Sequence, residues 1–384
     1  MNSTYDILII GGGINGAGIA RDAAGRGLRV ILFDKGKVGQ ATSSWSTKLI
    51  HGGLRYLEDY NFKLVHESLK EREIINYIAP NITNHLPFII PHSNQLRPAW
   101  LIKLGLILYD NIGGKSSLPK SQKINIENEY PNILKSNYKM GFKYFDLQVN
   151  DQKLVELNIQ DAKKRGATIC ENKKVVKCER NKEYWDIYLD DKTNIKTKIV
   201  VNATGPWVNE VMKKILKINS PKSLRLVKGS HIIIKKLYKK NIAFTLQNND
   251  KRIIFVIPYK DDYTLIGTTE IEVSDPNNPN IDRNEIDYLI NCVNNYFIKK
   301  INEKDIIETY SGIRPLIEDF SDKASSISRD YIFDINTEKN LAPVLNIFGG
   351  KLTTYRKLST KALNELSIFF DNFPKDWTHK KKLI

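Results

Sequence analysis

The sequence has few of the residues that build cross-linked or metal-bound proteins. It contains three cysteines, and the spacing of Cys170, Cys178 and Cys292 suggests neither a zinc site nor a disulfide framework, which indicates a reducing compartment. Its six histidines form no metal-ligand cluster, so we expect no metal. The N-terminus runs directly into a short apolar strand without the features of a signal peptide, and a cytoplasmic chain is the expectation.

Acidic residues are outnumbered by basic ones, and the formal net charge is +16. Such a charge attracts acidic partners, including anionic lipid and phosphorylated metabolites. A second explanation needs no partner, because a composition rich in Lys, Asn and Ile can follow from genome base composition. The chain lacks the basic and aromatic array of a nucleic-acid-binding module, so we expect no nucleic-acid partner.

The sequence also lacks internal repeats and low-complexity linkers, and its 384 residues favour two domains over one. Three widely separated segments read as a strand followed by a glycine turn. We therefore expect an α/β fold with a discontinuous, Rossmann-like dinucleotide-binding domain and an antiparallel-sheet substrate domain. The first would comprise residues 1–90, 150–215 and 335–375, and the second residues 91–149 and 216–334.

The first glycine turn carries a dinucleotide-binding fingerprint. Gly11, Gly13 and Gly16 form G-x-G-x-x-G between a predicted strand and a predicted helix. This spacing allows a tight turn and close approach of the backbone to a pyrophosphate at the helix N-terminus. Asp34 ends the second predicted strand, where a carboxylate can bind ribose hydroxyls.

The other glycine turns favour FAD over NAD as the dinucleotide. Residues Asn202–Gly205 place a turn at a later strand end, and Gly349 and Gly350 place a third, as an extended FAD would require. Apolar periodicity predicts a helix that begins beside these last glycines and Lys351. The positive charge of a lysine at this position is unfavourable beside the positive end of the helix dipole. Its presence is explained if the lysine stabilises the anionic edge of a reduced flavin. The alternative is a solvated lysine at an ordinary helix start.

Three further stretches concentrate residues suited to phosphate and proton chemistry. His51, Arg55 and Tyr56 follow the fingerprint within "SSWSTKLIHGGLRYLE". Arg314 precedes a proline in "YSGIRP" and is biased to extended backbone, which suits a side chain held out into a cavity. His231 begins a predicted strand in "KGSHIII".

Together these motifs resemble those of the FAD-dependent glycerol-3-phosphate dehydrogenases. The resemblance implies oxidation of sn-glycerol 3-phosphate to dihydroxyacetone phosphate, with electrons passed from the flavin to a membrane quinone. It runs in order to about Trp377 and rests on "IIGGGINGAGIARDAAGRGL", "ATSSWSTKLIHGGLRYLE", "LRPAW", "VNATGPW", "KGSHI", "IGTTE", "YSGIRPL" and "IFGGKLTTYRKL".

The resemblance also implies roles for individual residues. We favour His231 as the catalytic base and keep His51 as its competitor, because a neutral imidazole can accept the C2 hydroxyl proton. Lys351 would serve flavin, substrate or both. The residues expected to bind the substrate phosphate are Arg55, Tyr56, Arg314 and, as a weaker candidate, Arg329. Those expected to hold a noncovalent FAD are Gly11, Gly12, Gly13, Ile14, Asn15, Gly16, Asp34, Thr42, Ser43, Ser44, Lys48, Leu49, His51, Gly52, Gly53, Val176, Ala203, Thr204, Gly205, Trp207, Gly312, Gly350, Lys351, Leu352 and Thr353.

Members of this family continue into a helical C-terminal domain, whereas this chain stops at Ile384. We expect that domain to be absent. Two alternatives to a quinone-linked dehydrogenase stay open: an oxidase that passes the electrons to oxygen, and an inactive flavin-binding remnant. A homodimer also stays open.

One segment, Leu96 to Gly113, is apolar but too short and too charged to span a bilayer. Its aromatic and apolar residues, which include Trp100 and Leu104, suit a helix lying in a membrane interface. The alternative is a buried core helix. We expect peripheral attachment to anionic lipid on the inner face of the cell membrane.

Overall fold

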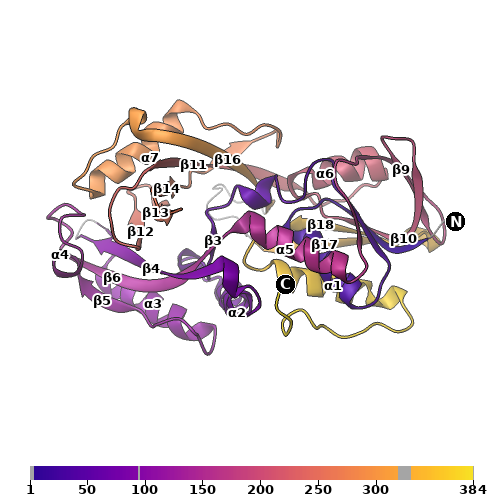
Figure 1. The fold of residues 1–384 in the computed structure, drawn as a ribbon, viewed down its shortest axis with the longest axis horizontal. Helices are drawn as coiled ribbons and strands as arrows, with labels where there is room; N and C mark the ends of the chain where they lie inside the picture. The colour runs from indigo at the N-terminus through magenta and orange to yellow at the C-terminus, as the bar shows by residue number, and fades with distance from the viewer. Residues whose placement is uncertain (1–3, 94–95, 319–329, 384) are drawn as a thin grey trace.

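The computed structural model describes residues 4–93, 96–318 and 330–383, and the strands of this part of the chain form two sheets in separate halves of the molecule (Figure 1). The strands of the first sheet are β1 (Tyr5–Ile10), β2 (Val30–Phe33), β7 (Thr168–Cys170), β8 (Val175–Arg180), β9 (Trp185–Leu189), β10 (Asn194–Asn202), β17 (Tyr331–Asn336) and β18 (Val344–Gly349). Those of the second are β3 (Leu49–Ile50), β4 (Thr83–His92), β5 (Gln122–Asn125), β6 (Met140–Val149), β11 (Leu224–Lys235), β12 (Ala243–Gln247), β13 (Ile253–Tyr259), β14 (Tyr263–Gly267), β15 (Ile271–Val273) and β16 (Ile306–Ile317).

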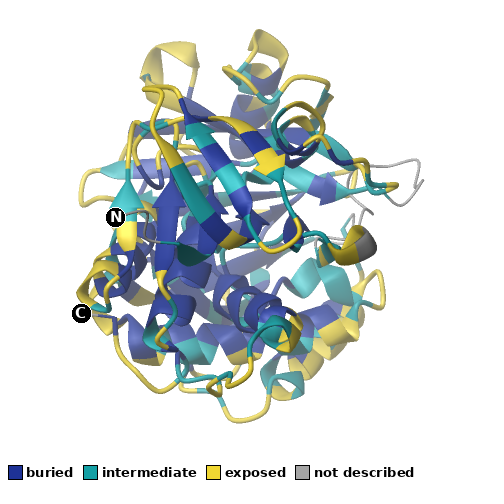
Figure 2. Cartoon of the chain, turned by 90° about the vertical axis from the view of Figure 1, so that its right-hand side faces the viewer, coloured by how far each residue is buried: buried dark blue, intermediate teal, exposed yellow. Residues whose placement is uncertain are grey.

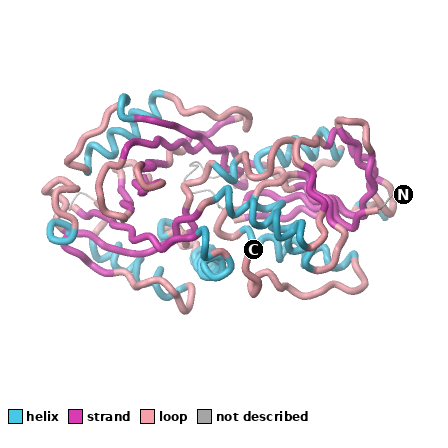
Figure 3. The backbone as a smooth tube through the Cα atoms, viewed as in Figure 1, coloured by secondary structure: helices cyan, strands magenta, loops and turns pink. Residues whose placement is uncertain are grey.

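Helices cover both sheets, and Figure 3 shows how they cluster beside the strands. They are α1 (Ile14–Gly25), α2 (Phe62–Ile78), α3 (Ala99–Ile112), α4 (Ile126–Glu129), α5 (Asp151–Lys164), α6 (Val208–Val211), α7 (Arg283–Tyr296) and α8 (Tyr355–Leu366). Buried residues concentrate in the strands and on the helix faces turned toward them, while the exposed residues lie mainly in peripheral loops (Figure 2).

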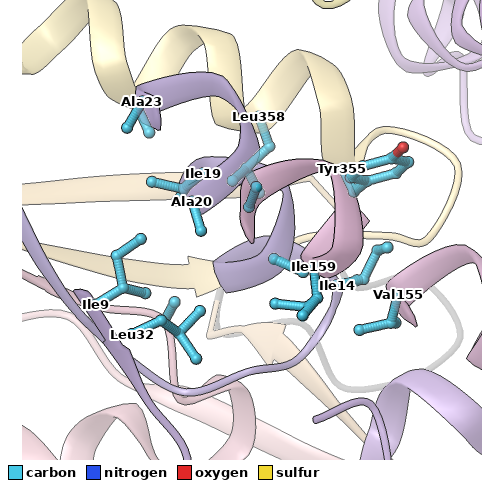
Figure 4. Packing of buried hydrophobic residues seen from close by; sticks show 14 of the residues in the cluster. Ile9, Ile14, Ile19, Ala20, Ala23, Leu32, Val155, Ile159, Tyr355 and Leu358 are labelled. Carbon is cyan, nitrogen blue, oxygen red and sulfur yellow. The ribbon is translucent and has the colours of Figure 1, made fainter. Parts of the chain in front are cut away.

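The first sheet has the order β17-β18-β10-β1-β2-β7, and its strands from β18 to β7 run parallel. Parallel strands of this kind are buried on both faces, which explains the continuous apolar run in β1. Ile9 and Leu32 of the sheet pack against Ile19 of α1, and the same core includes Ile159 of α5 and Leu358 of α8 (Figure 4).

The three strands that end in glycine turns are neighbours in this sheet. Strand β1 lies between β2 and β10, and β10 pairs in turn with β18. Because they are parallel, their carboxyl ends meet at one edge, although the segments are up to 340 residues apart in sequence. The predicted α/β class, with a Rossmann-like region beside a β-rich one, is confirmed.

The second sheet has the order β15-β11-β14-β13-β12-β4-β6-β3, with β16 paired to β11 and β5 paired to β6. It was expected to be antiparallel, and its pairs are antiparallel except β12 with β4, which run parallel. Helix α7 contributes to the core on one side of this sheet, and α2 and α3 contribute to the core on the other.

Two of the expected domain bounds fall inside strands. Residue 90 lies within β4, which belongs to the second sheet, and residue 334 lies within β17, which belongs to the first. A division by sheet membership would therefore move β3 and residues 83–90 to the second region and residues 331–334 to the first. The domain bounds remain a prediction.

Candidate active site

A cavity of about 760 Å³ begins at the carboxyl ends of the parallel strands and reaches the second sheet. Its walls combine the glycine turns of the first region with side chains from β11 and β16. The predicted site residues that line it are Gly11, Gly13, Ile14, Asn15, Asp34, Thr42, Ser43, Leu49, His51, Tyr56, Ala203, Thr204, Gly205, Trp207, His231, Gly312, Arg314, Gly350, Lys351, Leu352 and Thr353.

The glycines of the fingerprint serve two different purposes. A Cβ at Gly16 would lie 1.9 Å from the Gly11 carbonyl oxygen, so the tight turn itself excludes a side chain there. A Cβ at Gly13 would come no closer than 3.2 Å to a neighbouring atom, the Ser43 Oγ. Gly13 immediately precedes α1 and lines the cavity, so it leaves the helix N-terminus open to an anion.

Asp34 directly follows β2 and lines the cavity. Its carboxylate accepts hydrogen bonds from the backbone N–H of Gly12 at 2.6 Å and of Gly36 at 2.8 Å. Burial raises the pKa of Asp34, and these two bonds act in the opposite direction. The carboxylate is thereby held in one orientation beside the glycine turn, where a ribose hydroxyl can donate to it.

Lys351 lies outside the helix that was predicted to start beside it. Helix α8 begins at Tyr355, because residues Leu352–Thr354 form a turn in which the Thr354 N–H donates to the Lys351 carbonyl oxygen at 3.2 Å. The Lys351 ammonium therefore does not oppose the helix dipole from within the first turn. Its Nζ lies 4.0 Å from the centre of the Tyr56 ring, a cation–π arrangement, and both residues line the cavity.

His231 is fully buried at the end of the cavity formed by the second sheet. Its ring stacks on Tyr310 with 4.7 Å between centres, and its Nε2 lies 3.1 Å from the Thr47 Oγ. Burial holds the pKa of His231 well below its ordinary value, and the positive charges of Arg314 and Lys48 lower it further. These effects favour the neutral imidazole, which is the form with a nitrogen lone pair that can accept a proton.

Arg314 projects from β16 into the same end of the cavity. Its Nη1 lies 3.2 Å from Glu270 Oε1, and its Nη2 donates to the Thr268 Oγ at 2.7 Å. The Arg55 Nη1 lies 3.9 Å from the other Glu270 oxygen, so this carboxylate bridges two of the predicted phosphate ligands. Arg55 is not among the lining residues, and Arg329 lies outside the described residues.

Several predicted cofactor residues are not among those that line the cavity: Gly12, Gly16, Ser44, Lys48, Gly52, Gly53 and Val176. Lys48 pairs with Asp151 at 2.8 Å. Val176 has 41% of its surface exposed, whereas its buried neighbour Val175 lines the cavity. Adjacent residues of a strand point to opposite faces, so an error of one position changes which valine faces the ligand.

Sequence reasoning did not identify Thr47, Glu270 or Val175. Thr47 stands in the "SSWSTK" motif, but nothing in its spacing indicates a contact with a histidine 184 residues later. Glu270 follows a pair of threonines in "IGTTE", a stretch whose spacing indicates no ligand contact. The pairing of β15 and β16 with the same strand, β11, is what brings Glu270 beside Arg314.

Comparison with known proteins agrees with this geometry. The family model described as FAD dependent oxidoreductase matches residues 6–355. The aerobic glycerol-3-phosphate dehydrogenase of Escherichia coli K12 is 44% identical over 386 residues, which cover 99% of this chain and 77% of that protein. The D-erythritol 1-phosphate dehydrogenase of Brucella abortus is also 44% identical, over 99% of this chain and 77% of that protein.

A solved structure is similar over nearly the whole chain. The glycerol-3-phosphate dehydrogenase of Bacillus halodurans, complexed with FAD, has a TM-score of 0.77 and 27% identity, covering 99% of this chain and 68% of that one. The chain is thus a flavin-dependent oxidoreductase. It belongs to the FAD dependent oxidoreductase family, in the branch of the glycerol-3-phosphate dehydrogenases.

The cofactor of this chain is FAD, as the sequence predicts. The described residues fit an extended dinucleotide, because one cavity joins Asp34, the open turn at Gly13 and the turn at Gly350 and Lys351. Asp34 would hold the ribose, and the α1 N-terminus would hold the pyrophosphate. Lys351 would lie beside the flavin.

Proposed function

We propose that this chain oxidises sn-glycerol 3-phosphate to dihydroxyacetone phosphate and passes the electrons to a membrane quinone. The observation that carries the proposal is the convergence of His231, Arg314 and Lys351 on the cavity that joins the glycine turns. A base, a planar cation and a second cation at one end of a dinucleotide cavity suit an alcohol that bears a phosphate group.

Oxidation of the alcohol removes a hydride from C2 and a proton from the C2 hydroxyl. Bound FAD supplies the hydride acceptor. The neutral imidazole of His231 accepts the proton, and the stacked Tyr310 ring together with the Thr47 hydroxyl fixes its orientation. His51 lines the same cavity and remains the competing base.

The phosphate of the substrate needs charged donors in a fixed geometry. Arg314 provides a planar guanidinium whose position is set by Glu270 and the Thr268 hydroxyl. Lys351 adds a second positive charge next to the Tyr56 ring. Arg55 approaches the same Glu270 carboxylate and would join this group through a small movement.

A second substrate is favoured by one comparison. The dehydrogenase of Brucella abortus named for D-erythritol 1-phosphate is as similar to this chain as the Escherichia coli protein is. Both substrates carry a phosphate beside a secondary alcohol, so the groups described here suit either. If the cavity has room for the additional carbon of D-erythritol 1-phosphate, the protein should bind this substrate more tightly than glycerol 3-phosphate.

The test is anaerobic mixing of the purified FAD-loaded protein with each substrate while the flavin absorbance is recorded. Bleaching by glycerol 3-phosphate, with weaker or slower bleaching by D-erythritol 1-phosphate, supports the proposal. The reverse order assigns the longer substrate, and bleaching by neither indicates an inactive remnant. Reoxidation by a soluble quinone supports the quinone acceptor, whereas hydrogen peroxide formed in step with substrate indicates an oxidase.

For the membrane contact, we propose the outer face of α3. The helix has apolar residues on two faces: Ile102, Leu106 and Tyr109 are buried, while the opposite face is exposed. The exposed fraction is 68% for Trp100 and 47% for Leu104. No helix in the described part of the chain is long and apolar enough to cross a bilayer.

An exposed apolar face with an aromatic residue suits the interface of an anionic membrane, and the net charge of +16 favours it. We therefore propose peripheral attachment at the inner face of the cell membrane. Sedimentation with anionic vesicles at low salt should be weakened by Trp100→Ser together with Leu104→Ser. The matched control is Ile298→Ser with Ile307→Ser, which removes two exposed apolar residues, one just after α7 and one within β16. Figure 1 shows α7 and β16 on the opposite side of the second region from α3. Equal sedimentation of both double variants would contradict the assignment to α3.

A further inference from the structure

The buried face of α3 contacts the backbone of the active-site wall. Tyr109 projects from this helix, and its Oη accepts a hydrogen bond of 2.7 Å from the Gly52 N–H. Gly52 follows His51, which lines the cavity. A residue of a peripheral helix is thus in direct contact with the segment His51–Gly53, although 57 positions separate it from Gly52 in sequence.

Tyr109 is held in place by a carboxylate on the second sheet. Its hydroxyl donates to Asp146 of β6, with distances of 2.9 and 2.8 Å to the two carboxylate oxygens. Arg72 of α2 pairs with the same carboxylate at 2.8 Å. All three side chains are buried, so the group forms a rigid support inside the protein.

The protonation of this group fixes the direction of each hydrogen bond. Burial raises the pKa of Tyr109 well above its ordinary value, and the Asp146 charge raises it further. Tyr109 therefore keeps its proton and donates it to Asp146, which leaves a lone pair of its oxygen for the Gly52 N–H. Burial raises the pKa of Asp146 to about 6, against the opposing effect of Arg72.

The segment His51–Gly53 is also tied to the turn that carries Lys351. The His51 N–H lies 3.3 Å from the Thr353 Oγ, and the same hydroxyl lies 3.3 Å from the His51 carbonyl oxygen. Thr353 lines the cavity beside Lys351. The segment is held between Thr353 on its cavity side and Tyr109 behind it.

Packing leaves little room for this segment to move toward α3. A Cβ on Gly52 would lie 2.5 Å from the Leu69 Cδ2 and 2.8 Å from a ring carbon of Tyr109. Loss of the Tyr109 hydroxyl would remove the acceptor that lies 2.7 Å from the buried Gly52 N–H and leave this group only the Asp146 carboxylate, toward which the backbone would have to shift.

We propose that Tyr109, supported by Asp146, is a positioning residue of the active site: it fixes the His51–Gly53 segment beside the flavin and the reacting carbon. Its effect on substrate oxidation rests on the proposed function, whereas its effect on the flavin environment does not. Small displacements of groups that face reacting atoms lower rates strongly, so the hydroxyl should matter for the rate more than for binding.

The test is Tyr109→Phe in the FAD-loaded protein. We expect flavin reduction at saturating glycerol 3-phosphate to slow by about 10-fold, with a shift in the visible flavin spectrum. The apparent dissociation constant of the substrate should change less than about 3-fold, because Arg314 and Lys351 are untouched. The matched control is Tyr144→Phe, which removes another buried hydroxyl, bonded at 3.0 Å to the Thr245 Oγ, from the same hydrophobic cluster.

A second variant keeps the proposal testable if Tyr109→Phe does not fold. Asp146→Asn keeps an acceptor for the Tyr109 hydroxyl but removes the negative charge. We therefore expect a rate loss and a spectral shift in the same direction as in Tyr109→Phe, but smaller. Wild-type spectrum and rate in either variant, or equal losses in Tyr144→Phe, would overturn the proposal. If glycerol 3-phosphate fails to reduce even the wild-type protein, the proposed function is wrong, while the flavin spectrum still tests Tyr109.

Discussion

The two regions of the molecule present ligand-facing groups in different ways. In the first, the cavity wall is formed by backbone at the ends of parallel strands, where Gly13 lines the cavity without a side chain. In the second, the ligand-facing groups are side chains on antiparallel strands. His231 of β11 lies opposite Tyr310 of β16, and Arg314 lies four residues further along β16. A backbone site depends on local spacing, whereas a side-chain site depends on strand register.

The sharpest test of this contrast is within the fingerprint. Gly13→Val should abolish FAD binding and leave the fold intact, because the added side chain enters the cavity where the pyrophosphate is expected. Gly16→Val should instead prevent correct folding, since its Cβ alone would overlap the Gly11 carbonyl oxygen. Flavin absorbance and far-ultraviolet circular dichroism measure the two effects. A yellow, fully loaded Gly13→Val protein would refute the placement.

The side-chain site is tested next by removal of the base. His231→Ala should retain FAD and slow flavin reduction by about 100-fold or more, as expected when general-base catalysis is lost. His51→Ala is the rival variant, and stopped-flow reduction by glycerol 3-phosphate measures both. If His51→Ala alone stops reduction, the two histidines exchange roles.

A smaller effect is expected from the phosphate ligand. Arg314→Lys keeps the charge but loses the planar fork, so flavin reduction by glycerol 3-phosphate should weaken by about 10-fold. Arg225→Lys is the matched control, because Arg225 lies on the neighbouring strand β11 and pairs with Glu272 away from the cavity. Unchanged kinetics in Arg314→Lys would remove this arginine from the site.

The features that could be predicted from the sequence are those set by local spacing, and those that could not are set by strand register or packing. Gly11, Gly13 and Asp34 could be assigned from spacing, since a glycine turn after a strand has few functions. The start of α8 could not, because apolar periodicity continues through the turn at Leu352 before the helix begins. The Val176 assignment differs by one position from the residue that lines the cavity, at a point where the register of β8 against β9 shifts.

Contacts between distant segments could not be predicted from the sequence, for a physical reason. Tyr109 reads as one apolar position of an amphipathic helix, and only the pairing of β6 with β4 and the packing of α3 bring it to Asp146 and Gly52. Glu270 likewise reads as a surface residue until β15 and β16 both pair with β11. Such contacts leave no pattern in the neighbouring sequence, because the hydrogen-bonding partner of each residue lies on a distant segment that only the complete fold brings close.

The smallest expected effect concerns pH and separates two buried groups of the second region, His231 of β11 and Asp146 of β6. For an ordinary imidazole with a pKa of 6.5, the neutral fraction would fall about 5-fold between pH 6.5 and pH 5.5. Burial and the charges of Arg314 and Lys48 hold the pKa of His231 well below that value, so the neutral base persists across this range. Protonation of His231 should therefore lower the limiting rate of flavin reduction by less than about 2-fold over this pH range.

Asp146 complicates the measurement, because burial raises its pKa to about 6 and its protonation would weaken the support of Tyr109 at the same pH. The control is the same profile in Asp146→Asn, where this titration is absent. A flat profile in that variant, with a shallow acid-side fall in the wild-type protein, would assign the fall to the carboxyl group. A 5-fold fall in both proteins would mean that the base titrates as an exposed histidine does, and His231 would then be an unsuitable assignment, because it is fully buried.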